Sequence, residues 1–423
     1  MNIMKSRLLK PLATLLSGSF LAQGITLVSY LLLTRIYSPA DFGVFNIFYS
    51  YIEILIIIST CKYELAPVIA DSDREASAIS RFALRLNTFV SVAILLVILV
   101  LNVFHFLPGK LQSIGWITVF IPFMVFFCGT TRVYAALFNR FRKFGQIVWS
   151  DTTISVCGAF FKIVSGLLKP LHAIGLPMGT VLGQAAGNVN YIANIRKLNI
   201  SKDVSRDECR AAARKFRKFP LFTASKDFVD SFSSNLPFIW VATAIAVPDA
   251  QVGLYGLALT FTWRPVNVFN TAAERVLYVE IGERLHNRRP IGRVIARFVL
   301  GVGLITLPVF ALLFVYAEPF FSFVFGSKWA GSAPYLHALL PWMWILLLTN
   351  SLLSVPYALS KQQGEFAFSL VALLLRVVGL AIGIANQDFI LAIQLFAVAS
   401  SLVLVLRLVW YTILLHRYDK ETV

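Results

Sequence analysis

The chain has 423 residues, of which 58% are hydrophobic and 14% are charged, and its formal net charge is +17. A mean hydropathy of +0.75 excludes a soluble globular domain of this length. The basic residues lie between apolar blocks and form no continuous face, which excludes a nucleic-acid-binding protein and is typical of the loops of a membrane protein. The composition therefore predicts an all-α protein with many membrane-spanning helices.

Six apolar segments fill the first half of the chain. Lys5, Arg7 and Lys10 precede the first segment, which is too long for the apolar part of a cleaved signal peptide and is expected to remain as a helix. About 20 helical residues suffice to cross a hydrocarbon core of about 30 Å. The expected helices cover residues 12–33, 44–66, 87–107, 114–137, 146–168 and 171–195, with a polar loop at 71–85.

Residues 196–218 form the only long polar stretch of the sequence. The run Ala211 to Ala213, with no Gly or Pro in the stretch, predicts a short helix, and its basic residues predict that the helix lies on a membrane surface. Membrane lipid with anionic headgroups is the expected partner, at ~1 kcal/mol per basic residue near the surface. The basic residues are Arg196, Lys197, Lys202, Arg206, Arg210, Arg214, Lys215, Arg217 and Lys218.

The second half repeats the plan of the first. Six further apolar segments are expected to form helices at residues 220–246, 252–279, 294–316, 336–359, 366–385 and 389–415. We therefore predict twelve transmembrane helices in two six-helix lobes, residues 1–196 and 220–423, joined by the basic linker 197–219.

The distribution of lysine and arginine predicts the orientation in the membrane. If the N-terminus is cytoplasmic, the cytoplasmic segments hold 31 of the 38 basic residues, the outer loops hold four and the helices hold three. Short cytoplasmic loops of membrane proteins carry such an excess of positive charge. The sequence therefore predicts that both termini are cytoplasmic.

The two halves also resemble each other weakly. The turn at residues 39–45 matches 248–255. Lys162 in the fifth helix corresponds to Arg376 in the eleventh, and each is followed by an apolar pair and then by Gly-Leu, with Ser165 as an extra residue in the first copy. Internal repeats of this kind are common in transporters, so the pattern favours a transporter.

Ordered motifs along the whole chain carry a family resemblance. Those of the first half are Leu33, Thr34, Arg35, Tyr37, Ser38, Pro39, Asp41 and Gly43, followed by Lys62, Tyr63, Glu64, Leu65 and Ala66. Those of the second half are Lys215 to Pro220, Leu236, Pro237, Gly253, Leu254, Tyr255, Arg264, Pro265, Phe325, Gly326, Trp329, Ala333, Pro334, Leu340 and Pro341. Together they resemble the polysaccharide-biosynthesis flippases, which export O-antigen and capsule repeat units and belong to the multidrug, oligosaccharidyl-lipid and polysaccharide exporter superfamily.

This resemblance implies a fold and a function. The fold would be two six-helix lobes around a central cavity. The function would be transport by alternating access of an undecaprenyl-pyrophosphate-linked oligosaccharide from the cytoplasmic to the periplasmic leaflet of the bacterial inner membrane. O-antigen, capsule and exopolysaccharide pathways all remain open, and the polymerase and chain-length proteins of the same pathway are candidate partners.

Charged residues inside the predicted helices are the candidate site residues, because a charge at the centre of a membrane helix costs roughly 2.5 to 3.5 kcal/mol unless it meets a cavity or a partner. Glu53 and Arg264 occupy matching depths in the two halves. The candidate substrate-binding residues are Arg264, Arg376, Lys162, Lys226, Lys62 and Arg35. The candidate ion-coupling or pairing residues are Glu53, Asp230, Asp151 and Glu64.

Several of these residues also have a purely structural interpretation. Lys62 and Glu64 lie near cytoplasmic helix ends, where snorkelling or an ion pair that closes a hairpin is an alternative to substrate contact. Arg264 has two alternative partners, Glu53 of the other lobe and Asp230. Arg376 and Lys162 have no obvious acidic partner in their own helices, which favours a cavity role for them.

Enzyme activity is not expected. The sequence has no Gly-rich loop ending in Gly-Lys-Ser or Gly-Lys-Thr, and its five histidines and four cysteines follow no metal or catalytic spacing. No catalytic residue, metal or cofactor is therefore predicted. The alternatives are a multidrug exporter of the same superfamily and a polytopic glycan-modifying enzyme. The basic residues embedded in helices favour an anionic substrate over a cationic drug.

The membrane potential favours the expected transport step. A pyrophosphate lipid carries about two negative charges, and an inside-negative potential favours outward movement of each by ~2.3 kcal/mol per 100 mV. Coupling to a proton or Na⁺ stays open, with Glu53, Asp151 and Asp230 as the candidate carriers.

Overall fold

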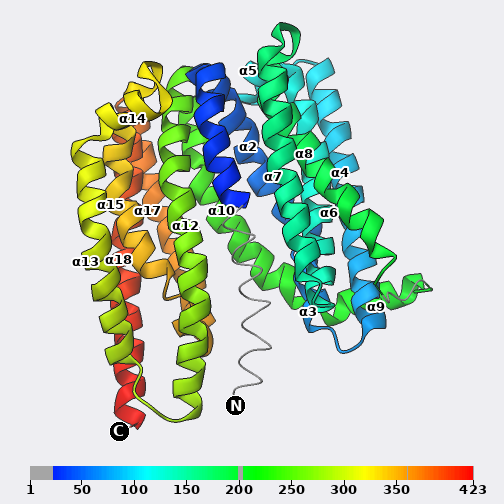
Figure 1. Cartoon of the computed structure of the whole chain (residues 1–423), viewed down its shortest axis with the longest axis vertical. Helices are drawn as coiled ribbons and strands as arrows, with labels where there is room; N and C mark the ends of the chain where they lie inside the picture. The colour runs from blue at the N-terminus through cyan, green and yellow to red at the C-terminus, as the bar shows by residue number, and fades with distance from the viewer. Residues whose placement is uncertain (1–21, 199–202, 360, 423) are drawn as a thin grey trace. The chain divides into compact units, whose positions relative to one another are not determined.

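The computed structural model describes residues 22–198, 203–359 and 361–422. The described residues are almost entirely helical and include no β-strand, which confirms the predicted all-α class. Eight helices within these ranges are long and apolar enough to cross a membrane. The chain forms two compact units, Met1–Asn235 and Leu236–Val423 (Figure 1). It is a multi-pass membrane protein.

Unit 1 contains, among its described residues, a helix at Ala22–Ile36 followed by the helices that carry the candidate site. These elements are α2 (Pro39–Thr60), η1 (Tyr63–Leu65), α3 (Ala66–Ile69), α4 (Asp73–Val103), α5 (Leu111–Ile114), η2 (Gly115–Val119), α6 (Phe120–Arg140), α7 (Phe144–Leu167), η3 (Lys169–Ile174), α8 (Gly175–Ile195), α9 (Arg206–Lys215), η4 (Phe219–Ala224) and α10 (Ser225–Leu236). The part of the expected first helix that precedes residue 22 lies outside the described residues.

The predicted polar loop at residues 71–85 is wrong, because α4 begins at Asp73. The side chain of Ser72 accepts a hydrogen bond from the backbone N–H of Glu75 at 3.1 Å and caps the helix. Ala76, Ile79 and Ala83 are fully buried and form an apolar stripe at helical spacing. The charged residues that suggested a loop therefore lie on the polar faces of a helix that extends beyond the apolar segment.

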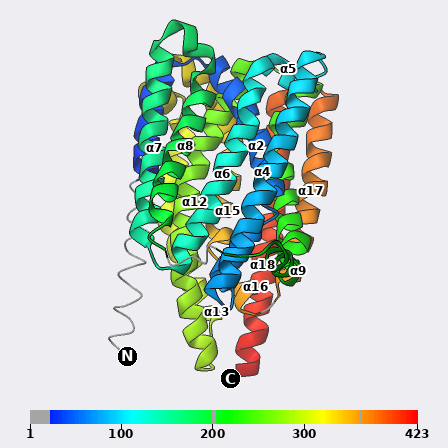
Figure 2. The same cartoon turned by 90° about the vertical axis from the view of Figure 1, so that its right-hand side faces the viewer.

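Helices α7 and α8 pack side by side in unit 1 (Figures 1 and 2). Glycines allow this close approach: a Cβ atom on Gly183 would lie 2.6 Å from the Cα of Gly158. Any larger side chain at Gly183 would force the two backbones apart. Their close packing fixes Asp151 on α7 and Gln184 on α8 relative to each other.

The expected helix at residues 220–246 is interrupted by two π-helical segments. The segment η4 precedes α10, and η5 (Pro237–Val241) follows it, with a proline at the start of each segment. Because proline lacks a backbone N–H, it disturbs the regular hydrogen-bond ladder of a helix. The compact units divide at Asn235, so residues 220–235, which the sequence assigned to the second lobe, fall within unit 1.

Unit 2 is built around α15 (Ala333–Asn350), which packs against α12 (Asp249–His286) and α18 (Phe389–Thr422), while α17 (Gln362–Ala385) packs against α18. Its first long helix runs without a break through Pro265 and extends to His286, beyond the predicted end at residue 279. The elements of unit 2 after η5 are α11 (Ala242–Ala244), α12 (Asp249–His286), α13 (Gly292–Val315), α14 (Ala317–Phe325), η6 (Ser327–Ser332), α15 (Ala333–Asn350), α16 (Ser354–Ala358), α17 (Gln362–Ala385) and α18 (Phe389–Thr422).

A buried polar cluster joins α17 and α18 in unit 2. Arg407 Nη2 lies 2.5 Å from Glu365 Oε2, and the hydroxyl of Tyr411 donates to Glu365 Oε1 at 2.6 Å. Arg407 Nε in turn donates to the Tyr411 hydroxyl oxygen at 2.9 Å. The side chain of Glu365 is 2% exposed, so its charge depends on these partners.

Candidate functional site

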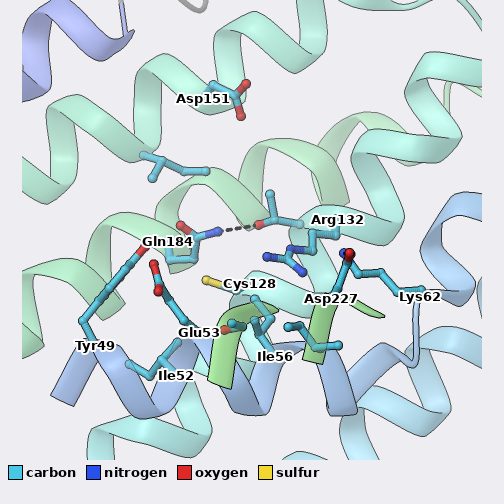
Figure 3. A pocket seen from close by; sticks show the side chains of 14 residues that line it. Tyr49, Ile52, Glu53, Ile56, Lys62, Cys128, Arg132, Asp151, Gln184 and Asp227 are labelled. Carbon is cyan, nitrogen blue, oxygen red and sulfur yellow. Dashed lines mark hydrogen bonds and ion pairs between the residues drawn. The ribbon is translucent and has the colours of Figure 1, made fainter. Parts of the chain in front are cut away.

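A pocket of about 500 Å³ lies within unit 1, between α2, α6, α7, α8 and α10 (Figure 3). Its lining is mixed, with five charged and four polar uncharged side chains among apolar ones. Polar groups at this depth of a helical bundle point to binding of a polar group, since each is costly without a partner. The lining residues are Tyr49, Ile52, Glu53, Ile56, Ile57, Lys62, Cys128, Thr131, Arg132, Asp151, Ile154, Gln184, Asp227 and Ser231.

Helical periodicity places these side chains on the pocket wall. Residues three and four apart share one face of a helix. This spacing brings Cys128, Thr131 and Arg132 of α6 to the pocket, and likewise Asp227 and Ser231 of α10. The rigid helices therefore hold the polar groups in a fixed arrangement.

Lys62 reaches the pocket from the turn after α2. The backbone of Cys61 and Lys62 is left-handed, with φ of 48° and 61°, which ends the helix and reverses the chain. Lys62 Nζ forms an ion pair of 2.7 Å with Asp227 Oδ2 of α10. This ion pair joins the turn to α10 and does not close the hairpin that follows α2, and it neutralises Asp227 within the pocket.

Arg132 projects from α6 toward the middle of the pocket, with Glu53 on one side and Lys62 and Asp227 on the other (Figure 3). Its Nη1 lies 3.9 Å from Glu64 Oε1, which is beyond hydrogen-bond distance. Within the described ranges, this is the closest acidic contact of Arg132, whose side chain is 40% exposed. The planar fork of guanidinium donors therefore remains available to a ligand.

Glu64, the acidic neighbour of Arg132, is buried, with 4% of the residue exposed. Its Oε2 atom accepts no hydrogen bond from any described residue. Glu64 and Arg132 thus form a loose pair, of which only Glu64 is buried, and neither group has all its hydrogen-bond partners.

Two further carboxylates line the pocket. Glu53 Oε2 accepts a hydrogen bond of 3.0 Å from the side-chain amide of Asn235. Asp151 is half-buried on α7 and makes no hydrogen bond or ion pair with the part of the chain that is described. Asp151 precedes Lys162 by eleven positions, as Glu365 precedes Arg376, so the two acids correspond in the repeat. In unit 2, Arg407 neutralises Glu365, whereas in unit 1 Asp151 faces the pocket.

The pocket brings together three of the predicted site residues, Glu53, Lys62 and Asp151. Lys226 instead forms an ion pair of 2.8 Å with Asp230 one turn along α10. These two residues are therefore a local pair next to the pocket lining.

Other predicted residues of unit 1 lie elsewhere. Lys162 Nζ lies 5.5 Å from the centroid of the Phe45 ring and is absent from the pocket lining. The side chain of Arg35 is exposed near the end of the helix Ala22–Ile36.

The two predicted arginines of unit 2 occupy different surroundings. Arg264 is half-buried on α12, directly before Pro265. The guanidinium of Arg376 lies 4.9 Å from the centroid of the Phe396 ring, and its Nε donates to Ser400 Oγ at 2.8 Å. Aromatic and hydroxyl partners thus hold Arg376 against α18. Substrate contact by either arginine stays a prediction.

Two charged residues of the pocket lining were missing from the predicted set, Arg132 and Asp227. Arg132 lies inside the expected helix 114–137, and a charge inside a helix is the sequence signal for a candidate site residue. It was counted with the basic turn that follows this helix and was therefore left out of the candidates. Asp227 is adjacent to the predicted Lys226, and only the packing of α10 shows which of the two neighbours faces the pocket.

The sequence and the fold each match known proteins. The family model described as polysaccharide biosynthesis protein matches residues 32–334. One relative is the succinoglycan biosynthesis transport protein ExoT of Rhizobium meliloti (strain 1021), which is 23% identical over 364 residues, covering 83% of this chain and 68% of the relative.

Two solved structures have a similar fold. The first is an inward-facing multidrug resistance transporter of the MATE family in the MOP superfamily, with a TM-score of 0.74 and 11% identity over 94% of this chain and 96% of that one. The second is the lipid II flippase MurJ in an inward closed conformation, with a TM-score of 0.71 and 13% identity over 96% of this chain and 89% of that one. These matches confirm the resemblance that the ordered motifs predicted.

Proposed function

The chain belongs to the polysaccharide biosynthesis protein family, and from this membership we propose that it is a flippase for an undecaprenyl-pyrophosphate-linked oligosaccharide repeat unit. It moves this lipid from the cytoplasmic to the periplasmic leaflet of the bacterial inner membrane by alternating access. The name of the relative ExoT, a succinoglycan biosynthesis transport protein, supports a polysaccharide precursor as the cargo. The similar fold of the lipid II flippase MurJ supports a lipid-linked one.

The observation that carries the proposal is the position of Arg132 in the pocket of unit 1. Its guanidinium points into the pocket with one loose ion pair at 3.9 Å. Arginine matches phosphate oxygens with two parallel hydrogen bonds, and such charge-assisted bonds are roughly twice as strong as neutral ones. We propose that Arg132 binds the pyrophosphate, while the polar groups of Thr131 and Gln184 nearby bind sugar hydroxyls.

Twelve transmembrane helices with both termini in the cytoplasm fit this function. Eight spans meet the criteria of length and apolarity among the described residues. The four additional spans of the proposal are the first helix, of which Ala22–Ile36 is described, α8, the interrupted helix from η4 to α11, and α12. Their polar residues or breaks are compatible with positions that line a cavity instead of facing lipid.

Asp151 and Glu53 are the proposed carriers of a coupling ion in unit 1. A carboxylate with no cation beside it is costly inside a membrane protein and favours either protonation or binding of a cation. Asp151 meets this description because no described residue pairs with it. A returning proton or Na⁺ adds its driving force to that of the membrane potential.

The same carboxylates favour a second candidate function, export of a cationic drug. The pocket holds Glu53, Asp151 and Asp227 against Lys62 and Arg132, so acids outnumber bases. The fold similarity to a multidrug resistance transporter agrees with this candidate. Membership of the polysaccharide biosynthesis protein family favours the flippase over this exporter.

Reconstitution of the purified chain into vesicles distinguishes the two functions. One set of vesicles contains undecaprenyl pyrophosphate bearing a fluorescent oligosaccharide, and dithionite added outside reports how much of the label has crossed. A second set measures uptake of a cationic dye. We expect transbilayer movement of the lipid and no dye uptake. Dye uptake without lipid movement would show that the protein is an exporter of cationic drugs and not a flippase.

A further inference from the structure

Helix α9 lies across the first turns of α4 at one end of unit 1 (Figure 1). The side chain of Ser205 caps it by accepting a hydrogen bond from the Glu208 backbone N–H, and the Glu208 carboxylate accepts one from the Ser205 backbone N–H at 2.7 Å. One face of α9 is apolar and buried on unit 1. The buried contacts are made by Cys209, Ala212 and Ala213 of α9, and by Phe216 directly after it, with Ala76, Ile79 and Ala83 of α4 and with Tyr63.

Ion pairs hold one edge of α9 at the start of α4. Lys215 Nζ lies 2.7 Å from Asp71 Oδ2 and 2.5 Å from Glu75 Oε1. Arg74 Nε donates to Glu208 Oε1 at 2.6 Å. Hydrogen bonds from Arg74 and then from the Ser205 backbone lower the pKa of Glu208 to about 2, and bonds to Asp71 and then to Glu75 raise the pKa of Lys215. This edge therefore faces the first residues of α4.

Three arginines of α9 lie away from the edge that carries Glu208 and Lys215, and we call them the arginine edge. At about 100° per residue, Glu208 and Lys215 lie within ~20° of each other around the helix. Arg206 and Arg210 lie roughly 140° to 180° from these two residues, and Arg214 lies roughly 100° to 120° from them, on the outward side of the helix. All three arginines are exposed. Since the edge with Lys215 faces the start of α4, the arginine edge faces along α4 toward its apolar stretch.

The apolar stretch of α4 begins about one Debye length from α9. Phe89 is 71% exposed and begins the run of exposed large apolar residues on α4. It follows Ile79, on which α9 rests, by ten residues, or about 15 Å at 1.5 Å per residue. A helix with its side chains has a radius of ~5 to 6 Å. The gap between the edge of α9 and the start of the apolar stretch is therefore about 9 to 10 Å, close to the Debye length at physiological salt. Arg85 is exposed within this interval and adds to the positive charge.

We propose that the arginine edge of α9, formed by Arg206, Arg210 and Arg214, docks on anionic lipid headgroups of the leaflet beside which α4 begins. Asp207 is the acidic residue next to this edge, and it contacts Arg210 at 3.7 Å with both side chains largely exposed. The edge is therefore strongly positive overall. The buried apolar face is covered by α4, so headgroup charge rather than insertion into lipid holds α9 to the bilayer.

Hydrogen exchange of the full-length chain in lipid nanodiscs tests the docking. The backbone of residues 206–215 is expected to exchange at least about threefold more slowly with phosphatidylglycerol present than in phosphatidylcholine alone. Arg206→Gln, Arg210→Gln and Arg214→Gln together should abolish this difference, while the ion pairs of Lys215 keep α9 folded. High salt should have the same effect on the unchanged chain.

Two controls separate this docking from other effects. Arg288→Gln, Arg289→Gln and Arg293→Gln remove the same charge from exposed positions in the turn after α12 and at the start of α13, and they should preserve the lipid dependence of α9. Equal exchange of α9 in both lipids would overturn the proposal and assign the edge to an acidic protein. If the control variant also loses the difference between the two lipids, the effect arises from the overall charge of the protein and not from the arginine edge of α9. The readout does not involve transport, so it is independent of the proposed function.

Discussion

Arg132 is the residue whose removal should affect transport most directly. Arg132→Lys keeps the charge but loses the bidentate geometry, and we expect it to retain part of the flipping rate. Arg132→Ala should lower the rate at least about tenfold, which corresponds to ~1.4 kcal/mol or one charge-assisted hydrogen bond. Arg142→Gln is the matched control, because Arg142 is exposed just beyond the same helix. The measurement is the dithionite assay in vesicles.

The alternative role of Arg132 is to neutralise the buried Glu64. In that case Arg132→Ala strands a carboxylate and lowers the melting temperature, and adding Glu64→Gln restores both stability and transport. A stable but inactive protein in the single and the double variant agrees with substrate binding. Recovery of transport in the double variant would contradict it.

Arg264 gives the corresponding prediction in unit 2. Arg264→Lys should retain partial transport, and Arg264→Ala should lose most of it, because both the charge and the paired donors serve a pyrophosphate. The structural alternative is pairing with Glu53 or Asp230, although Asp230 already has Lys226 at 2.8 Å. Complementation and protein level are measured for Arg264→Ala alone and combined with Glu53→Gln or Asp230→Asn. Restored transport in either double variant excludes substrate binding by Arg264.

The packing of α17 against α18 depends on the buried cluster of Glu365, Arg407 and Tyr411. Glu365→Ala leaves the charge of Arg407 buried without its partner and should lower the free energy of unfolding by roughly 3 to 5 kcal/mol. Tyr411→Phe removes hydrogen bonds only, and the expected loss is about 1 to 2 kcal/mol. Thermal denaturation of the purified chain measures both. Arg417→Gln, at an exposed position near the end of α18, should change stability by less than about 0.5 kcal/mol. Equal effects of Glu365→Ala and Arg417→Gln would mean that the cluster is not stabilising.

The attachment of α9 to α4 should depend on pH in a defined direction. Bonds from Arg74 and Lys215 lower the pKa values of Glu208 and Asp71, to about 2 for Glu208. The contribution of these two carboxylates to the stability of the attachment is present above the ordinary carboxyl pKa of about 4 and is lost as the pH falls toward 2. The raised pKa of Lys215 contributes below its ordinary value of about 10 and is lost above it. Protection of residues 206–215, corrected for intrinsic exchange rates, should therefore stay constant near neutrality and decrease in acid. Constant protection down to pH ~2 would show that the apolar face alone holds α9.

The topology of the whole molecule follows from the charge bias. In a variant without the four native cysteines, Lys328→Cys should react with an impermeant maleimide added to intact cells, and Arg288→Cys should react only after the membrane is opened. The physical reason is the excess of positive charge retained in cytoplasmic loops. Labelling of Arg288→Cys in intact cells would contradict the proposed orientation.

Sequence alone established the membrane class, the helical fold and the family. Apolar segments of about 20 residues have few alternatives in a bilayer, because every backbone polar group there must be paired within the segment or in a closed barrel. The motifs from Leu33 to Pro341 carried the family resemblance that the match over residues 32–334 confirms. The charged segment at residues 71–85 was misassigned because helix formation beyond the membrane depends on the cap at Ser72 and on packing against α9.

Only the tertiary structure decided which charges share a pocket. Depth along a helix is readable from the sequence, but the direction of a side chain depends on how neighbouring helices pack. Packing therefore placed Glu53, Lys62 and Asp151 together, added Arg132 and Asp227, and left Lys162 against an aromatic ring outside the pocket lining. It likewise gave Glu365 an arginine partner while leaving its counterpart Asp151 facing the pocket, a difference that the weak repeat in the sequence does not reveal.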